Sequence, residues 1–391
     1  MNATLTVWLK EVRENLRDKR TVFSALIYGP LIGPVMFVVL MNVLVGHEMK
    51  KAEGPLKVPV IGAAHAPNLI GALKQWGLVP QPPIADPDKA VRDRDADVVM
   101  RIPADYGKAW SSGKPAQVDL IFDASQQGSN TPTKRLETML ERYGREQGAL
   151  RLLARGLSPS VAAPLVISKR DQSTPQSRAG MFLSFLPYFF VIAVYIGGMY
   201  LAIDLTAGER ERQSLEPLFA NPVARWRVLV GKLGAICSFS LASLVLTAIG
   251  FSVAGHVMPA EKLGMAFDLG PGFIVDAILL ELPLIALFAV LETLVAAFAK
   301  SYREAQTYLG FLMIIPIVPS MLMGFLPVKP AHWMYAIPLL GQQIGISDLL
   351  RGTPVSAGDI GIALVFGFAL AFLIGLGTAV VYRSERLAIS A

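Results

Sequence analysis

Six long apolar stretches divide the chain, and each is long enough to cross the roughly 30 Å hydrocarbon core of a bilayer as a helix. They are residues 21–46, 179–203, 233–255, 273–299, 305–326 and 360–382. A helix satisfies all its backbone hydrogen bonds internally, which lipid requires. The pattern therefore predicts an α-helical integral membrane protein with six transmembrane helices.

Residues 47–178, between the first two stretches, have a mixed pattern typical of a soluble domain. Apolar and β-branched runs predict strands at 57–63, 96–102, 118–122 and 165–168, and apolar residues at helical spacing predict helices at 67–76, 86–94 and 131–155. Pro59 predicts that the first strand lies at a sheet edge. The expected fold is an inserted extracytoplasmic α/β domain between helices 1 and 2.

Basic residues gather on one side of the predicted membrane. They flank the apolar runs at 10–20, 210–232, 300–303 and 383–386. The positive-inside rule makes this side cytoplasmic, together with both termini and the 383–391 tail, whereas long translocated segments largely escape the rule. Residues 1–20 predict an interfacial helix with an apolar face. That face is formed by Leu5, Trp8, Leu9, Val12 and Leu16.

Composition narrows the classes of function. The 391 residues are 53% hydrophobic and 17% charged, too apolar for an ordinary soluble protein of this length. The net charge of +6 does not indicate nucleic-acid binding, because the basic residues flank apolar runs. Cys237 is the single cysteine, so no intrachain disulfide or cysteine metal site is expected, and the four histidines are scattered. No phosphate-binding loop is present, so ATP hydrolysis would require a separate subunit.

A charged segment at 204–232 separates the second and third apolar stretches. Leu215, Leu218 and Phe219 fall at i, i+3 and i+4 and share one face of a short helix, whereas residues 209–212 cover the rest with charge. Asn221-Pro222 ends the helix. Such an amphipathic helix can bind a soluble partner, or it can be a solvated loop that only fixes topology.

This segment resembles the signature of type-2 ABC exporter permeases. The matching residues are Glu209, Glu211, Ser214, Leu215, Leu218, Pro222, Gly231 and Lys232, with Gln213-Ser214 standing where many relatives have Gly-Thr. The resemblance implies a coupling helix that docks on an ATPase subunit. Its contact residues would be Glu209, Arg210, Glu211, Arg212, Ser214, Leu215, Leu218 and Phe219.

Residues 96–107 and 113–125 add a second resemblance, to the extracytoplasmic insert of one branch of that superfamily. The branch includes the sodium-efflux permease NatB and several drug and lipid exporters. The resemblance implies two ATPase subunits that carry ATP and Mg, a second permease protomer (a homodimer in the simplest case), and a bacterial cytoplasmic (inner) membrane. Sodium or an amphiphilic drug or lipid would be the exported substrate.

Two acidic residues, Glu281 and Glu292, interrupt the fourth apolar stretch. A charge at the centre of a bilayer costs at least about 2.5 kcal/mol, so such residues normally face a cavity or a partner. Eleven residues are about three turns, which places both glutamates on nearly the same helix face. They are candidates for a substrate or ion path, with helix assembly as the alternative. For Glu292, which lies near the cytoplasmic end, a structural or coupling role is favoured.

The segment near 328–350 is too apolar for a free loop and too short for two crossings. It predicts a re-entrant hairpin at the outer leaflet, anchored by Trp333 and Tyr335. With His332, these residues are candidates for an outer gate, and the alternative is a helix lying on the membrane surface.

Two further classes of function stay open at this stage. A proton-coupled secondary transporter would work through Glu281 without an ATPase and would show inverted repeats, which we do not find. A membrane-anchored sensor or enzyme would work through residues 47–178, where acidic and basic residues are dispersed.

Overall fold

The computed structural model describes residues 3–162, 170, 172, 174–175, 185–214, 223–257, 269–319 and 329–383. The chain divides into two compact units: unit 1 comprises Met1–Met41 and Gln172–Ala391, and unit 2 comprises Asn42–Asp171.

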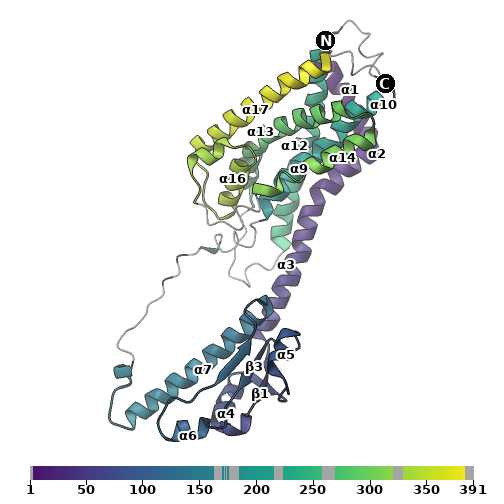
Figure 1. Cartoon of the computed structure of the whole chain (residues 1–391). Coiled ribbons are helices and arrows are strands. Elements are labelled where there is room, and N and C mark those ends of the chain that lie inside the picture. Colours follow the sequence, from purple (N-terminus) through teal and green to yellow (C-terminus); the bar gives the residue numbers. More distant parts are fainter. Residues whose placement is uncertain are drawn as a thin grey trace. The chain divides into compact units, whose positions relative to one another are not determined.

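Unit 1 is helical (Figure 1). Its elements are α1 (Ala3–Arg17), α2 (Lys19–Val22), the π-helix η1 (Phe23–Tyr28), α3 (Gly29–Glu53), α9 (Leu186–Ile203), the π-helix η4 (Asp204–Gly208), α10 (Glu209–Glu211), α12 (Arg225–Val257), α13 (Pro271–Phe298), α14 (Tyr302–Leu312), the 3₁₀ helix η6 (His332–Ala336), α16 (Leu340–Leu350) and α17 (Ala357–Arg383).

Five helical stretches within the described ranges are long and apolar enough to cross a membrane. They are Lys19–Val43, Leu186–Glu211, Arg225–Val257, Pro271–Phe298 and Ala357–Arg383. The chain is therefore a helical protein with several membrane-spanning helices. The further crossing expected at 305–326 lies partly outside the described residues, and α14 occupies its first half. Six crossings thus remain a prediction.

Helix α9 forms the centre of unit 1, and most of its side chains are buried. Small residues let its neighbour α12 approach closely: a Cβ on Gly197 would lie 2.6 Å from the Cβ of Ser243. Ser243 Oγ donates a hydrogen bond to the carbonyl of Ala193 at 2.9 Å. This arrangement is typical of helix packing in lipid, where small residues and interhelical hydrogen bonds hold helices together.

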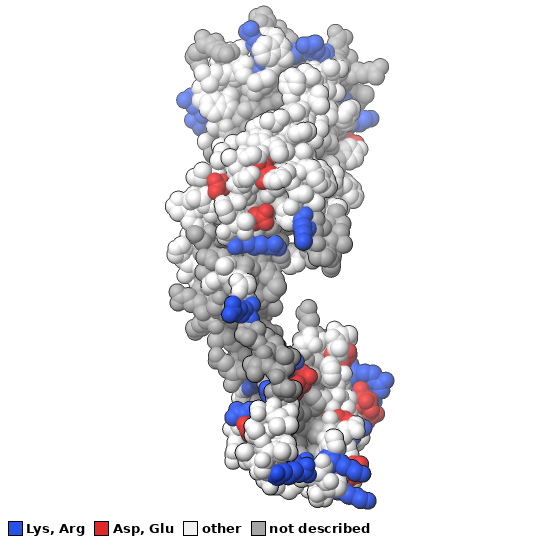
Figure 2. Space-filling model, turned by 90° about the vertical axis from the view of Figure 1, so that its left-hand side faces the viewer, with Lys and Arg blue, Asp and Glu red and all other residues white. Residues whose placement is uncertain are grey.

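The outer surface of unit 1 suits a lipid environment. Helices α3 and α17 expose large apolar side chains, among them Val35, Val39, Phe366, Phe372 and Leu373. In the view of Figure 2, Lys and Arg gather at the upper end of this unit, and a band with little charge separates them from acidic and basic residues lower on the same unit.

Unit 2 is an α/β domain with a four-stranded sheet in the order β2-β1-β3-β4. Its elements are β1 (Leu56–Ile61), α4 (Pro67–Gln75), β2 (Leu78–Gln81), α5 (Pro87–Arg92), β3 (Val98–Arg101), α6 (Tyr106–Ser111), β4 (Asp119–Phe122) and α7 (Gln127–Leu153). Strand β1 is parallel to β2 and β3, and β4 is antiparallel to β3.

Alternating side chains of this sheet build a core on each of its faces. Val58 of β1 and Met100 of β3 join a cluster with α4, α6 and α7. Val99, the neighbour of Met100, packs instead with Val91 of α5 on the opposite face. Successive side chains of β3 therefore point to opposite faces of the sheet, and each face packs against its own helices.

The prediction that Pro59 marks an edge strand is wrong, because β1 pairs with a strand on both sides. Leu56 donates to Gly77 on the β2 side, and Ile61 accepts from Ile102 on the β3 side. Alternation places the nitrogen of Pro59 on the β3 side, where pairing begins only at Val60. Pro59 has no N–H to donate, and at this position no hydrogen bond to β3 is required, because the pairing of β1 with β3 starts one residue later.

Candidate functional site

The ends of several helices meet at one end of unit 1, which we call the charged end. It comprises α1, α2, α10, the beginning of α12, the turn between α13 and α14, and the end of α17. Contacts across the chain hold it together: the Arg20 guanidinium lies 5.4 Å from the centre of the Tyr302 ring. Arg225 Nη1 donates to the carbonyl of Arg383 at 2.8 Å.

A buried ion pair lies inside the charged end. Lys232 of α12 is fully buried, and its Nζ pairs with the carboxylate of Glu209, which is 7% exposed. The same Nζ donates to the carbonyl of Leu205 in η4 at 2.7 Å. The sequence placed Glu209 on an outward charged face, and the structure corrects this. The helix of α9 continues through η4 into α10, which turns Glu209 inward, and a buried lysine requires an anionic partner.

The next residues of the expected coupling segment bind the turn between α13 and α14. Arg210 Nη1 donates to the carbonyl of Ala299 at 3.3 Å, and the Tyr302 N–H donates to Glu211 Oε2 at 2.8 Å. Arg212 forms an ion pair of 3.0 Å with Asp204. These contacts fasten residues 209–212 to the ends of the membrane helices.

Helix α10 ends at Glu211, and Gln213 shortly after it has a positive φ of 56°. Ser214 then folds back, since its N–H and its Oγ both donate to the carbonyl of Glu209, at 2.9 and 3.1 Å. Leu215, Leu218 and Phe219, the expected apolar face of the coupling helix, lie outside the described residues.

Helix α1 covers the beginning of α12. Trp8 Nε1 donates to Ser238 Oγ at 3.0 Å, and a Cβ on Gly231 would lie 2.8 Å from Val7. Glu11 of α1 is 2% exposed. Its burial raises the pKa of the carboxyl, and this effect exceeds the opposing attraction to Lys10 and Lys232.

Sequence reasoning missed Glu11, and it did not predict which face of α1 packs against the helix bundle. Leu5 and Leu16, expected on the apolar face, are about half exposed, whereas Glu11 and Asn15 are buried. A signal was available, because Trp8, Glu11, Val12 and Asn15 follow the i, i+3, i+4, i+7 spacing of one helix face.

The two glutamates of α13 are fully buried within the chain. None of the four carboxylate oxygens of Glu281 and Glu292 has a hydrogen-bond partner among the described residues. Glu292 faces α9 and α12, since its Oε2 would lie 2.9 Å from a Cβ on Gly198. Both groups are thus inside the helix bundle of one chain rather than on its lipid surface.

Comparison with known proteins assigns the family. Residues 22–382, most of the chain, match the model of the ABC-2 family transporter proteins. The chain belongs to this family. It is also similar to the ABC transporter permease protein NatB of Bacillus subtilis (strain 168), with 27% identity over 354 residues that cover 88% of this chain and 89% of that protein. The chain is therefore an ABC permease, a transport subunit and not an enzyme, and the family implies an ATPase partner.

The segment of the permease that precedes α17 is partly folded against the bundle. Trp333 is 62% exposed, whereas Tyr335 is buried, and its hydroxyl donates to Asp348 at 3.2 Å. His332 Nδ1 lies 2.6 Å from Asp359 Oδ1, and Ser356 Oγ donates to Asp359 Oδ2 at 2.7 Å. Helix α16 has 11 residues, which is too short to cross a bilayer.

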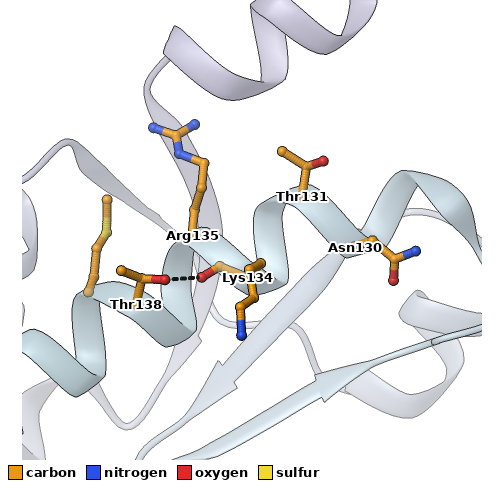
Figure 3. Close-up of a pocket in the computed structure, with 6 residues that line it drawn as sticks. Asn130, Thr131, Lys134, Arg135 and Thr138 are labelled. Atoms are coloured by element: carbon orange, nitrogen blue, oxygen red, sulfur yellow. Dashed lines mark hydrogen bonds between the residues drawn. The ribbon is translucent and has the colours of Figure 1, made fainter. Parts of the chain in front are cut away.

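One cavity of the permease lies in unit 2 and is lined by a single helix. About 530 Å³ lies along the beginning of α7, lined by Asn130, Thr131, Lys134, Arg135, Thr138 and Met139 (Figure 3). Arg135 donates to the carbonyl of Gly54 at 3.0 Å, and Thr138 donates to that of Lys134 at 2.8 Å. All six residues come from one helix, and we assign no ligand to this cavity. Among the described residues, His, Cys, Asp and Glu form no group of three that would hold a metal ion.

Proposed function

We propose that this permease is the membrane subunit of an ATP-driven exporter of the bacterial cytoplasmic membrane, with the charged end in the cytoplasm. Two copies would face each other and bind two ATPase subunits, which carry ATP and Mg. Residues 209–220 would form the docking segment. The family and the basic character of the charged end support this orientation.

The observation that carries the mechanism is the connection between the docking segment and the membrane helices. Residues 209–212 contact α12 through Lys232 and the α13–α14 turn through Ala299 and Tyr302. A displacement of this segment by the ATPase would therefore act on several helices at once. The buried ion pair between Glu209 and Lys232 transmits it to α12.

On the opposite side, substrate would leave past the 328–350 segment and the α/β domain at 47–178, which we place outside the membrane between the first and second crossings. His332, Trp333 and Tyr335 are the candidate gate residues. Sodium would suit the buried carboxylates of Glu281 and Glu292, and an amphiphilic drug or lipid would suit the apolar helices.

A secondary transporter driven by protons is the second candidate. The observation that favours it is the burial of Glu281 without a hydrogen-bond partner among the described residues. It requires transport by the purified chain alone.

Co-purification distinguishes these functions. The tagged chain is co-expressed with candidate ATPases, purified and assayed for ATP hydrolysis. The double substitution Leu218→Ala and Phe219→Ala removes the expected docking face. Val230→Ala is the matched control, because this valine is also apolar but lies 47% exposed on α12.

We expect ATPase activity to accompany the unmodified chain and the Val230→Ala control, and to be lost with the double variant. Retention of the ATPase by the double variant would contradict docking at this segment. Transport by the ATPase-free chain under a proton gradient would replace the ABC mechanism with the secondary one.

A further inference from the structure

A cavity of about 700 Å³ lies where α13 begins, within unit 1. Its lining includes Gly272 and Asp276 of α13 and Arg351 of the turn after α16. Helix α13 runs from here to Phe298, next to the charged end, so the cavity lies at the opposite end of this membrane-spanning helix. Its volume is within the range of known ligand sites.

The cavity is lined by one acidic and one basic side chain, those of Asp276 and Arg351. Neither side chain has an ion pair or a hydrogen bond to another described residue. Asp348 attracts Arg351 electrostatically but does not line the cavity, and its carboxylate accepts the hydroxyl of Tyr335 at 3.2 Å. The lining thus offers one positive and one negative group to a ligand, with no net charge.

The turn that carries Arg351 is held by its backbone. Gly352 has a positive φ of 74°, and the Thr353 N–H donates to the carbonyl of Asp348 at 2.9 Å. Helices commonly end in this way at a glycine, with a proline shortly afterwards, which here is Pro354. The position of Arg351 at the cavity is therefore determined by the end of α16.

The face of α13 that lines the cavity continues into an apolar surface. Gly272, Asp276 and Leu279 follow the i, i+4, i+7 spacing of one helix face, and Val275 lies beside them. Val275 is 55% and Leu279 is 37% exposed, on a helix long and apolar enough to cross a membrane. A ligand with its polar group in the cavity can therefore extend an apolar chain along this face.

The chemistry of the lining selects the type of polar group. A guanidinium donates two parallel hydrogen bonds to a phosphate, and a primary ammonium donates to a carboxylate. Quaternary ammonium groups are bound by cages of aromatic rings instead. Among the described residues that line the cavity, Phe273 is the one aromatic residue, and it is buried. A phosphate joined to a primary ammonium fits this lining better than a phosphate joined to a quaternary one.

We propose that this cavity binds the headgroup of phosphatidylethanolamine, with its phosphate at Arg351, its ammonium at Asp276 and an acyl chain along Val275 and Leu279. The lipid is a resident ligand of the permease, distinct from the exported substrate. Placement of the cavity in the outer leaflet rests on the proposed function, whereas recognition of the headgroup does not.

The first test measures lipid binding to the purified, delipidated chain in detergent by native mass spectrometry. Phosphatidylethanolamine, phosphatidylcholine and phosphatidylglycerol with identical acyl chains are compared at equal concentrations. We expect phosphatidylethanolamine to bind several-fold more tightly than the other two. The methyl groups of choline prevent hydrogen bonds to Asp276, and the glycerol headgroup has no ammonium. Equal binding of phosphatidylethanolamine and phosphatidylcholine would overturn the proposal.

Glycerophosphoethanolamine, the same headgroup without acyl chains, distinguishes a lipid from a soluble ligand. It should displace phosphatidylethanolamine only at concentrations at least about tenfold higher, because it cannot contact Val275 and Leu279. A tenfold step corresponds to the burial of only about two methylene groups. Displacement at equal concentrations would show that the cavity binds a soluble headgroup, and would overturn the lipid as its occupant.

Charge-neutralising variants test the two polar contacts separately. Asp276→Asn and Arg351→Gln should each weaken phosphatidylethanolamine binding by about tenfold or more, since each removes a hydrogen bond to a charged group. Asp276→Asn should also abolish the preference over phosphatidylcholine. Arg303→Gln is the matched control, because this exposed arginine of α14 is near the charged end, and it should keep full binding. Full binding by either cavity variant would contradict the assigned contact.

A further pair of variants fills the cavity without changing its charge. An added Cβ on Gly272 would meet nothing within 4 Å, so Gly272→Leu should fold and lose phosphatidylethanolamine binding. Gly361→Leu in α17 is the control, because a Cβ there also meets nothing within 4 Å and Gly361 does not line the cavity. Equal binding by both variants would overturn the proposal. No ATPase is used in these tests, so failure of the lipid site and failure of ATPase docking are observed separately.

Discussion

Lys232 and Glu209 lie 23 residues apart in the sequence and form an ion pair that is shielded from solvent at the charged end. The pair joins α12 to the helical continuation of α9. Lys232 also donates to the carbonyl of Leu205, so its ammonium group contacts two turns of that continuation. When the 209–214 segment moves, α12 must therefore either move with it or resist the movement.

Removal of one member of this pair should destabilise the protein strongly. Lys232→Met leaves the Glu209 carboxylate buried without its cation, and breaking a buried pair in this way costs about 3 to 5 kcal/mol. The expected result is a lower thermal unfolding midpoint and a reduced yield of monodisperse protein, measured by fluorescence-detected size-exclusion chromatography.

The double variant Lys232→Met with Glu209→Gln serves as the control for this prediction. It removes both charges and should recover most of the lost stability, because no buried charge remains. A single variant as stable as the unmodified chain would show that the pair is open to water.

The contact between α9 and α12 should tolerate no added volume at Gly197. A Cβ at this position would lie 2.6 Å from Ser243 Cβ and 3.0 Å from Ser240 Cα, so the helices must separate. We expect Gly197→Ala to destabilise the protein by about 1 to 3 kcal/mol, as overpacking of a tight core does.

The matched control is Gly377→Ala in α17, where an added Cβ would meet nothing within 4 Å. Alanine has the higher helix propensity, and this substitution should be neutral or stabilising by up to about 1 kcal/mol. Equal thermal unfolding midpoints for Gly197→Ala and Gly377→Ala would contradict the close approach of α9 and α12.

Periodicity predicted the secondary structure where one pattern dominated. The strand around Val98 and the helix beginning at Pro67 occur where the sequence indicated them, because each has a clear period and a defined start. Strand β2 (Leu78–Gln81) was not predicted. Its four residues contain Pro80 and only two apolar positions before it, and parallel pairing with β1 stabilises a strand too short to be recognised locally.

The candidate site was less accessible to the sequence than the fold. Nothing in the sequence indicated different solvent exposure among the charged residues 209–212, but tertiary contacts make it differ. Glu209 is buried against Lys232, whereas the side chain of Arg212 remains 57% exposed beside Asp204. The close approach of Glu292 to Gly198 was not predicted for the same reason, since it joins two helices that are distant in the sequence. Contacts between helices, unlike periodicity, are not encoded in any one segment.

The His332–Asp359 contact should give stability a specific pH dependence. The hydrogen bond to Asp359 and the negative charge of that carboxylate raise the pKa of His332 above its usual value of 6.5. A pKa raised in the folded state gives stability that is complete below the unfolded pKa and is lost as pH rises through the folded pKa.

We therefore expect the thermal unfolding midpoint of the unmodified chain to decrease, relative to that of His332→Gln, as the pH rises from about 6.5 through the raised pKa of His332. The difference should shrink at high salt, because the imidazole is exposed and screened. A midpoint difference that is constant from low to high pH would contradict protonation of His332 beside Asp359.

The last prediction concerns an aromatic stack in unit 2. The Trp110 ring lies between Tyr106 and Tyr143, each with its ring centre 5.7 Å away, and the Arg151 guanidinium lies 4.2 Å from the Trp110 ring centre. Arg151 also donates to the carbonyl of Trp110 at 2.9 Å. Arg151→Ala removes a cation–π contact worth about 0.5 to 2 kcal/mol and should speed amide hydrogen exchange in α6 and α7. Arg145→Ala, an exposed arginine of the same helix, should leave exchange unchanged. Faster exchange of equal size in both variants would show that loss of positive charge on α7, rather than the stack, determines its stability.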